Sequence, residues 1–185
     1  GGTDNGAVNG GDGSDSFDGG ANGASGDTID FFGAVGSVSV DLSTGTIADD
    51  GYGNGETVVN IENVDGSENI DNITGDSGKN TLDGQGGDDT LTGAAGNDTL
   101  IGGDGDDLFV FNDGDGDDSI EDFTVGAGSE DMIDLGGVSA LNNFAAVQAA
   151  TTQVGADAVI DTGAGDSITL LNVNAFNLSQ DDFLF

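Results

Sequence analysis

The sequence contains no cysteine and no histidine, and Lys79 is its only basic residue. Without cysteine the chain can form neither a disulfide framework nor a thiolate metal site. Without histidine or cysteine it cannot build a Ser-His-Asp or Cys-His nucleophile, or a histidine-based metalloprotease motif. A single cation also excludes nucleic acid as a natural partner and disfavours anionic membranes, because phosphate binding requires lysine and arginine.

Long apolar runs are missing as well. No stretch approaches the roughly 18 apolar residues of a transmembrane segment, and no basic region followed by an apolar run opens the chain. The chain starts at Gly1 without Met, which suggests a fragment or a processed product. The sequence has one Tyr and no Trp, so few aromatic side chains are available to stack against a sugar ring. Glycoside hydrolysis by paired carboxylates therefore has little support. We therefore expect no enzyme activity within this chain.

Acid and glycine are abundant instead. Among 185 residues there are 36 Asp and Glu and 36 Gly, and the formal net charge is −35. Zinc is poorly served without His or Cys, and magnesium requires tight octahedral geometry. Calcium accepts about six to eight oxygen ligands from carboxylates and backbone carbonyls in loose geometry. The composition therefore favours calcium as the partner of this chain.

The glycines and acids follow a nine-residue period over positions 66–110. Each unit begins with glycine and has an acid or amide at position six and an apolar residue at position eight. The units start at Gly66, Gly75, Gly84, Gly93 and Gly102; position six is Asp71, Asn80, Asp89, Asp98 and Asp107; position eight is Ile73, Leu82, Leu91, Leu100 and Phe109. One acid and one buried side chain at a fixed interval predict a stacked solenoid.

Further units lie on both sides of this tract. After a two-residue interruption, Asp113–Glu121 restores the frame, with Asp118 at position six. Upstream, Gly10–Asp18 is a near-perfect unit with Asp15, and Asn22–Asp30 keeps Asp27 and Ile29 in phase. Gly1–Asn9 keeps Val8 but lacks the acid. We expect residues 1–65 to form N-terminal repeat turns and longer β-coils, residues 66–121 the main roll, and residues 122–185 a C-terminal cap.

This register resembles the nonapeptide GGxGxDxUx, with U a large apolar residue, of the RTX family of hemolysin-type calcium-binding repeats in secreted bacterial proteins. The resemblance implies an all-β fold, a right-handed parallel β-roll (β-solenoid) with bound calcium and a β-rich C-terminal cap. In such a roll two units make one coil, so the turns of alternate units stack on one edge. Asp71, Asp89 and Asp107 would then share one edge, and Asn80, Asp98 and, if the interruption preserves phase, Asp118 would share the other.

The same resemblance implies several calcium ions between stacked turns. The predicted side-chain ligands are Asp15, Asp27, Asp71, Asp89, Asp98, Asp107 and Asp118, with Asp88, Asp104, Asp106 and Asp117 in support. Glycine at turn positions one, two and four would allow positive φ and let carbonyls point inward. The glycines predicted to contribute to the calcium sites through their backbone are Gly84, Gly86, Gly93, Gly96, Gly102, Gly103 and Gly105.

The alternative is a set of ordinary Asx turns or a solvated linker without metal. We expect five further acids to lie on solvated surface rather than to act as ligands: Asp41, Asp50, Glu56, Glu62 and Asp157.

The cap is expected to contain a short helix and strands. Ser139 could cap a helix ending near Ala150, with Leu141, Phe144 and Ala145 on one face. Strands are expected over Ala158–Asp161 and Ser167–Leu171. The last five residues, Asp181–Phe185, are similar to the tails of substrates of type I secretion, and could equally form a terminal strand over the end of the roll.

The resemblance also implies a function. The chain would stay unfolded in the calcium-poor cytoplasm, pass through a type I secretion exporter, and fold outside the cell, where it would be secreted or held at the cell surface. It would serve as the folding and secretion module of a protein with a fused upstream domain. A calcium-dependent, self-assembling surface or filament protein of the S-layer or adhesin kind is the alternative, and a carbohydrate-active enzyme module is a weaker third.

The unit at Gly75 provides a first prediction, because Asn80 replaces the acid and Lys79 lies beside it. The double variant Asn80→Asp with Lys79→Ala adds a negative charge and removes a positive one, so it should tighten the overall calcium affinity. A calcium titration measures the change. Weaker binding by the double variant would show that the stacking register is wrong.

Overall fold

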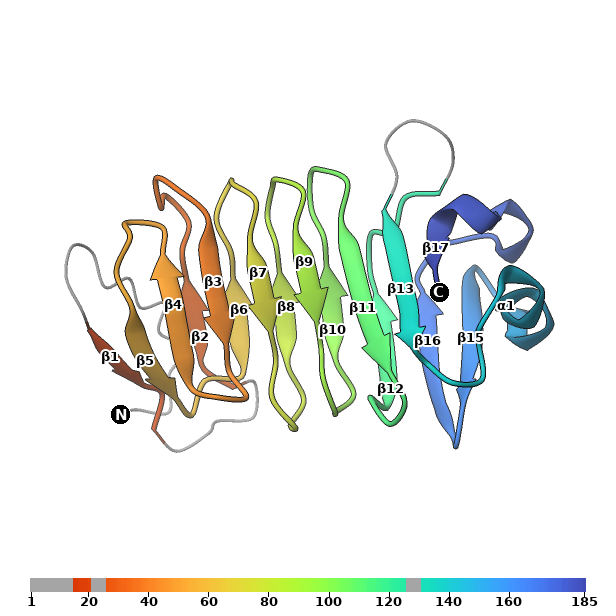
Figure 1. Ribbon diagram of the computed structural model, residues 1–185, viewed down its shortest axis with the longest axis horizontal. Coiled ribbons are helices and arrows are strands. Elements are labelled where there is room, and N and C mark those ends of the chain that lie inside the picture. The colour runs from red at the N-terminus through yellow and green to blue at the C-terminus, as the bar shows by residue number, and fades with distance from the viewer. Residues whose placement is uncertain (1–14, 21–25, 126–130) are drawn as a thin grey trace.

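The computed structural model describes residues 15–20, 26–125 and 131–185 of the chain (Figure 1). Strands are stacked crosswise along a rod, and the N-terminal and C-terminal segments lie at opposite ends of it (Figure 1). The unit Gly1–Asn9 and the first residues of the units at Gly10 and Asn22 lie outside the described residues. The Asp residues at position six of the latter two units, Asp15 and Asp27, are described.

Two sheets make up the rod. In the described residues the first sheet has nine strands in the order β1-β5-β4-β3-β7-β9-β11-β13-β17, and the second has eight in the order β14-β15-β16-β12-β10-β8-β6-β2. The first sheet comprises β1 (Ser16–Asp18), β3 (Val38–Asp41), β4 (Thr46–Asp50), β5 (Glu56–Val59), β7 (Asn72–Thr74), β9 (Thr90–Thr92), β11 (Leu108–Asn112), β13 (Met132–Gly137) and β17 (Phe183–Leu184). The second comprises β2 (Thr28–Asp30), β6 (Asn63–Asp65), β8 (Thr81–Asp83), β10 (Thr99–Ile101), β12 (Asp117–Ile120), β14 (Thr151–Val154), β15 (Asp157–Gly163) and β16 (Asp166–Leu170).

Each nonapeptide contributes one short strand, and successive units alternate between the two sheets. Parallel pairing aligns Ile73 with Leu91 and Leu91 with Phe109 in the first sheet. In the second sheet Leu82 pairs with Leu100. These position-eight side chains point inward and are 0% exposed, because alternate residues of a strand face opposite sides of the sheet. The nine-residue pattern therefore specifies both the strands and the apolar column between the sheets, and the predicted all-β roll is confirmed.

An antiparallel insertion interrupts the roll near its N-terminal end. β3 pairs with β4 and β4 with β5, both antiparallel, and β5 then pairs in parallel with β1. The second sheet has no such insertion, since β2 pairs directly with β6. β3, β4 and β5 follow one another along the chain, and the loop at residues 51–55 joins β4 to β5. Their arrangement as a three-stranded meander within one sheet brings Glu56 of β5 next to the start of β1.

The C-terminal cap contains α1 (Phe144–Ala150) and a second meander, β14-β15-β16. The predicted helix start at Ser139 is wrong. Asn143 caps the helix, accepting a hydrogen bond from the Ala146 N–H at 3.1 Å, because residues 138–141 form turns closed by Val138 N–H to Leu135 O and Leu141 N–H to Val138 O. The predicted helix face is also wrong, since Ala145 is exposed and Val147 is the buried residue.

The C-terminal tail covers the end of the first sheet. It forms the short 3-10 helices η1 (Ala175–Asn177) and η2 (Gln180–Asp182) and then β17, which pairs in parallel with β13. Phe183 is 4% exposed, and its ring centroid lies 5.9 Å from that of Phe144 on α1. The terminal strand that the sequence allowed is therefore present. None of the helices in the described segments has the length and apolar character needed to cross a membrane.

Leu91 lies at the centre of the apolar column and is 0% exposed. Leu91→Ala should lower the free energy of unfolding of the calcium-loaded chain by about 2–5 kcal/mol, because it leaves a cavity between stacked coils. Urea unfolding measures the loss. Thr90→Ala on the outward side of the same strand is the control, and an equal effect of the two substitutions would contradict the assigned core.

Candidate metal centre

The position-six acids of the first sheet form a continuous ladder along one edge of the roll. The N–H of Val38 donates to Oδ1 of Asp71 at 2.7 Å, and the N–H of Asp71 donates to Oδ1 of Asp89 at 2.7 Å. The N–H of Asp89 donates to Oδ1 of Asp107 at 2.9 Å, and that of Asp107 to Oδ1 of Asp131 at 3.1 Å. Each carboxylate is therefore fixed by the backbone of the preceding coil.

The second edge has an equivalent ladder. The N–H of Asn80 donates to Oδ1 of Asp98, and the N–H of Asp98 donates to Oδ1 of Asp118, both at 2.8 Å. Asp98 and Asp118 are separated by 20 residues rather than 18. The interruption before Asp113 is absorbed in the longer strand β11, so the phase is preserved. Nearer the N-terminus, the N–H of Asp27 donates to Oε2 of Glu62 at 2.8 Å in the same manner.

Three carboxylates of the main repeats have a buried oxygen without a donor. Asp89, Asp98 and Asp107 are 1–2% exposed, and their Oδ2 atoms have no hydrogen-bond partner. A buried carboxylate oxygen carries a desolvation cost that must be offset by a hydrogen bond or a cation. The single Lys of the sequence cannot serve all three. A hard cation that takes oxygen ligands fits this arrangement.

Glycine at position one leaves room beside these oxygens. A Cβ atom on Gly93 would lie 2.6 Å from Oδ2 of Asp98, and one on Gly66 would lie 2.6 Å from Oδ2 of Asp71 and 2.8 Å from the carbonyl oxygen of Gly84. A Cβ on Gly84 would similarly lie 2.7 Å from the carbonyl oxygen of Gly102. The carboxylate of one coil and a carbonyl of the next therefore converge where a side chain would block them. Carboxylate and carbonyl oxygens are the donors that calcium uses.

The predicted conformational role of glycine requires a correction at position one. Gly84, Gly93 and Gly102 do not adopt positive φ, so glycine is required there by close approach. Positive φ occurs at position four, in Gly96 and Gly105, and at position two, in Gly103. Position two tolerates other residues, because Gln85 and Ala94 adopt φ of 71° and 64°. Gly86, at position three, bridges to Asp104 of the next coil and does not need positive φ.

Burial of the carboxylates changes their protonation. It is the largest cause raising the pKa of Asp89 and Asp118 to about 7, and the pKa of Asp98 and Asp107 to about 6. Neighbouring carboxylates add to the effect, Asp71 and Asp107 at Asp89 and Asp98 at Asp118. Burial also raises the pKa of Asp71. Burial of these carboxylates in their charged form therefore has an energetic cost that a bound cation would remove.

The first two units differ from the later ones. Asp71 accepts hydrogen bonds at Oδ2 from the Ser67 N–H and at Oδ1 from the Ser67 hydroxyl, at 2.6 and 2.9 Å. Oδ1 of Asn80 accepts from the Asp76 N–H at 2.8 Å. These oxygens are already partnered by their own turns. We expect Asp71 to be a weaker cation ligand than Asp89 or Asp107.

The remaining predicted ligands lie in different surroundings. Asp27 is 6% exposed and its Oδ2 lacks a hydrogen-bond partner, as in the main repeats, whereas Asp15 is exposed just before β1. The four supporting acids are all exposed, three on turns and Asp117 at the start of β12: Asp88, Asp104, Asp106 and Asp117. They can contribute long-range attraction for cations. Among the residues described, no three acidic side chains converge on one point, so backbone carbonyls would have to supply most ligands.

Two residues of the ladders were not predicted as ligands from the sequence. Asp131 is the last acid of the first edge and is 4% exposed. The sequence does contain a signal for it, because the unit starting at Gly126 has Asp131 sixth and Ile133 eighth. Glu62 continues the second edge at a position where glutamate replaces aspartate and no glycine begins the unit. The prediction that Asp50 and Glu56 lie on solvated surface is wrong, since each is 6% exposed. The antiparallel insertion buries them.

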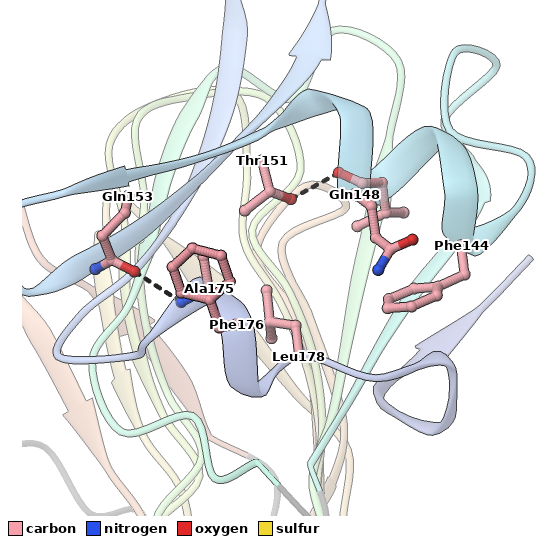
Figure 2. Close-up of a pocket in the computed structure, with 8 residues that line it drawn as sticks. Phe144, Gln148, Thr151, Gln153, Ala175, Phe176 and Leu178 are labelled. Atoms are coloured by element: carbon pink, nitrogen blue, oxygen red, sulfur yellow. Dashed lines mark hydrogen bonds between the residues drawn. The ribbon is translucent and has the colours of Figure 1, made fainter.

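A separate pocket of about 260 Å³ lies in the C-terminal cap between α1, β14 and η1 (Figure 2). Gln153 Oε1 accepts a hydrogen bond from the Ala175 N–H at 2.8 Å, and the Thr151 hydroxyl donates to the Val147 carbonyl at 2.7 Å. The lining residues are Phe144, Val147, Gln148, Thr151, Gln153, Ala175, Phe176 and Leu178. None carries a charge, so this pocket is chemically distinct from the carboxylate ladders.

Comparison with known families identifies the repeats. The family model of the RTX calcium-binding nonapeptide repeat (4 copies) matches residues 65–100 and, overlapping with these, residues 83–120. Residues 65–120 are RTX repeats. They bind calcium, and their number implies several ions. The matched RTX repeats contain the ladder residues Asp71 to Asp118, and the family is typical of secreted bacterial proteins.

The comparison with solved structures matches this chain to two named proteins. The extracellular lipase LipA of Serratia marcescens shares 19% sequence identity, and the match covers 94% of this chain and 34% of the lipase with a TM-score of 0.44. The AlgE6R3 subunit of the Azotobacter vinelandii mannuronan C5-epimerase shares 26% identity over 64% of this chain and 79% of that subunit, with a TM-score of 0.27. This chain therefore spans about a third of the lipase. No curated protein matches it.

The raised pKa values predict that acidification stabilises the calcium-free fold and weakens calcium binding. The pKa of folded Asp89 and Asp118 is raised from 3.8 to about 7, so between these values the folded state holds protons that the unfolded state has lost. Stability of the calcium-free chain therefore falls as pH rises through this window. In chelator, the β-signal in circular dichroism should increase on acidification towards about pH 5, where the carboxylates gain protons. Calcium affinity should decrease over the same change, and a parallel response of both quantities would contradict the site.

Asp98→Asn tests the contribution of a single position-six carboxylate. The substitution keeps the size of the side chain and its acceptor oxygen but removes the charge at the unpartnered oxygen, so about one calcium ion should be lost or weakened at least tenfold. Isothermal titration calorimetry measures both quantities. Asp161→Asn in the cap makes the same charge change at an exposed position and should leave binding unchanged. Equal losses in both variants would indicate a general charge effect.

Proposed function

We propose that this chain is a calcium-triggered folding module of an extracellular protein that leaves the cell through a type I exporter. The observation that carries the proposal is the pair of ladders with donor-free buried oxygens at Asp89, Asp98 and Asp107. Buried carboxylates at about the 5 Å spacing of neighbouring strands repel by about 3 kcal/mol at an effective dielectric constant of about 20. A chain with a net charge of −35 and one cationic side chain has no internal means of offsetting this.

Calcium supplies the missing stabilisation. At a free concentration about 100-fold above the dissociation constant, each ion stabilises the folded state by about 2.7 kcal/mol. Several such ions match the whole stability of an ordinary domain, roughly 5–15 kcal/mol. The side chains that hold them are Asp89, Asp98, Asp107 and Asp118, with weaker contributions from Asp71, Asp27 and Asp15. Folding and ion binding are then one event.

Coupling of folding to calcium binding is compatible with export of an unfolded chain. Cytoplasmic calcium is too low to fold the chain, so the chain stays extended for a narrow exporter, and extracellular calcium then folds it and prevents its return. The tail has two uses in this scheme. As an unfolded segment, Asp181–Phe185 is read by the exporter, and in the folded chain it becomes β17 against β13. The module itself performs no catalysis.

Self-assembly is the second candidate, and the edge of the second sheet favours it. In β14 the residues Thr152, Gln153 and Val154 are exposed, and Val154 retains 55% of its accessible surface. β14 pairs on one side only, with β15. An unpaired edge with an exposed β-branched side chain can add a strand from a second copy.

A calcium titration distinguishes the two functions. Far-UV circular dichroism follows folding, and multi-angle light scattering follows mass in the same samples. A folding module gives a disordered chain in chelator and a folded monomer at saturating calcium, whereas an assembling protein grows with calcium. A chain equally folded in chelator and in calcium would overturn the proposal.

Export is tested by co-expression with a type I exporter. The triple variant Phe183→Ala, Leu184→Ala and Phe185→Ala should remain in the cells while the parent chain reaches the medium. A second variant, Phe176→Ala, removes an exposed aromatic residue of the cap and should be exported normally. Equal export of all three chains would show that the tail is not the signal.

A further inference from the structure

The pocket in the C-terminal cap belongs to a part of the chain without charge. Residues 135–156 and 167–180 contain no acidic or basic side chain, although the chain of 185 residues has 36 acids. All the residues that line the pocket lie within these two segments. The pocket is therefore an uncharged site on a strongly anionic protein, and no residue of the carboxylate ladders lines it.

Apolar side chains form the walls of this pocket. The Phe144 ring on α1 packs against Phe183, with the ring centroids 5.9 Å apart, and Val147 of the same helix is 0% exposed. Phe176 stands across the pocket from Phe144, on η1 (Figure 2). The side chain of Phe176 is 92% exposed, yet its backbone is fixed, because its N–H donates to Oδ1 of the Asn174 cap at 3.0 Å. An ordered aromatic ring therefore lies exposed to solvent at the rim of the pocket.

Two polar groups of the pocket are open to a ligand. The side-chain amide of Gln148 points into the pocket (Figure 2) and makes no hydrogen bond within the described part of the chain. The Thr151 hydroxyl donates to the Val147 carbonyl at 2.7 Å, so its oxygen can still accept. Gln153 differs, because both ends of its amide are already bonded within the cap. The pocket thus offers donors and acceptors without a charge.

Charge and size restrict what can bind there. A net charge of −35 repels phosphates, sulfates and uronic acids, and no acid in the lining attracts a cation. The volume of about 260 Å³ is below the roughly 300–1,000 Å³ of drug-sized sites, so the pocket takes a single ring. A fully apolar ring would leave Gln148 and Thr151 without partners. These limits select a neutral ring with a polar edge.

We propose that this pocket binds the ring of a neutral sugar. A pyranose presents C–H groups on its face and hydroxyl groups at its edge, and each hydroxyl both donates and accepts. The C–H face contacts the exposed ring of Phe176, whose π-face is negative, and buries apolar area against Phe144 and Leu178. The hydroxyl groups bond to the Gln148 amide and the Thr151 oxygen.

Binding a sugar at this site does not imply hydrolysis. No residue that lines the pocket carries a carboxylate, whereas glycosidases use a pair of them. The site would instead attach the module to a neutral glycan. It shares no residue with the carboxylate ladders, so the inference does not depend on the export function proposed above.

Nuclear magnetic resonance of the calcium-loaded chain tests the site. The neutral probes are methyl α-glucoside, methyl α-mannoside, methyl β-galactoside and N-acetylglucosamine. At least one of them should cause saturable shifts of the Gln148 side-chain amide and the Phe176 backbone amide. Mannuronate and glucose 1-phosphate should bind about tenfold more weakly than that sugar, because they are anions.

Variants of exposed residues separate the site from the fold. Phe176→Ala and Gln148→Leu should each weaken sugar binding by about fivefold, the effect of losing one ring contact or one hydrogen bond. Both side chains are exposed, so the fold should persist. Val154→Ala is the matched control, because Val154 is 55% exposed on β14 but does not line the pocket. It should bind the sugar as the wild type does.

Several results would overturn the inference. One is the absence of shifts with every neutral probe, and another is unchanged affinity in both pocket variants. Equal binding of the anionic sugars would contradict the argument from charge. Tighter binding of toluene than of any sugar would show a site for an apolar side chain of a partner protein. Shifts that depend on protein concentration without sugar would show that a second copy fills the pocket.

Discussion

Repulsion between carboxylates stacked at the spacing of neighbouring strands governs this structure. The hydrogen bonds from Asp71 to Asp89 and from Asp89 to Asp107 hold the acids of successive coils directly above one another. Each coil therefore adds an apolar residue to the column and a negative charge to the edge. The apolar column favours stacking and the charge opposes it, so the balance depends on cations. A solenoid has a thin core, which makes the electrostatic part of this balance unusually large.

The same constraint explains the distribution of glycine. Position one approaches the carboxylate and the carbonyl of the next coil so closely that a Cβ atom on Gly93 or Gly66 would contact an Oδ2 atom at 2.6 Å. Position two is less demanding, since Gln85 and Ala94 adopt the required positive φ. A repeat can therefore lose the glycine at position two and keep its shape, whereas a side chain at position one would enter the space where the oxygens converge.

Antiparallel meanders lie near both ends of the roll. The β3-β4-β5 meander lies within the first sheet, between β1 and β7, and the β14-β15-β16 meander extends the second sheet at the C-terminal end. At the C-terminal end the antiparallel hairpins end the parallel repeat because they reverse the chain before another coil can form. The C-terminal meander also introduces chemistry that the repeats lack, the uncharged pocket.

By itself, the sequence determined the repeat strands, the inward residues such as Leu91 and Leu100, and the two edges on which Asp89 and Asp98 lie. A nine-residue period with one apolar and one acidic position leaves few other ways to bury the apolar residues. The nine-residue frame also reaches Asp131, sixth in the unit at Gly126. The tertiary structure decided the burial of Asp50 in the antiparallel insertion and the helix cap at Asn143. These depend on the antiparallel pairing of β4 with β3 and β5, or on turns such as residues 138–141. Local periodicity carries no information about either.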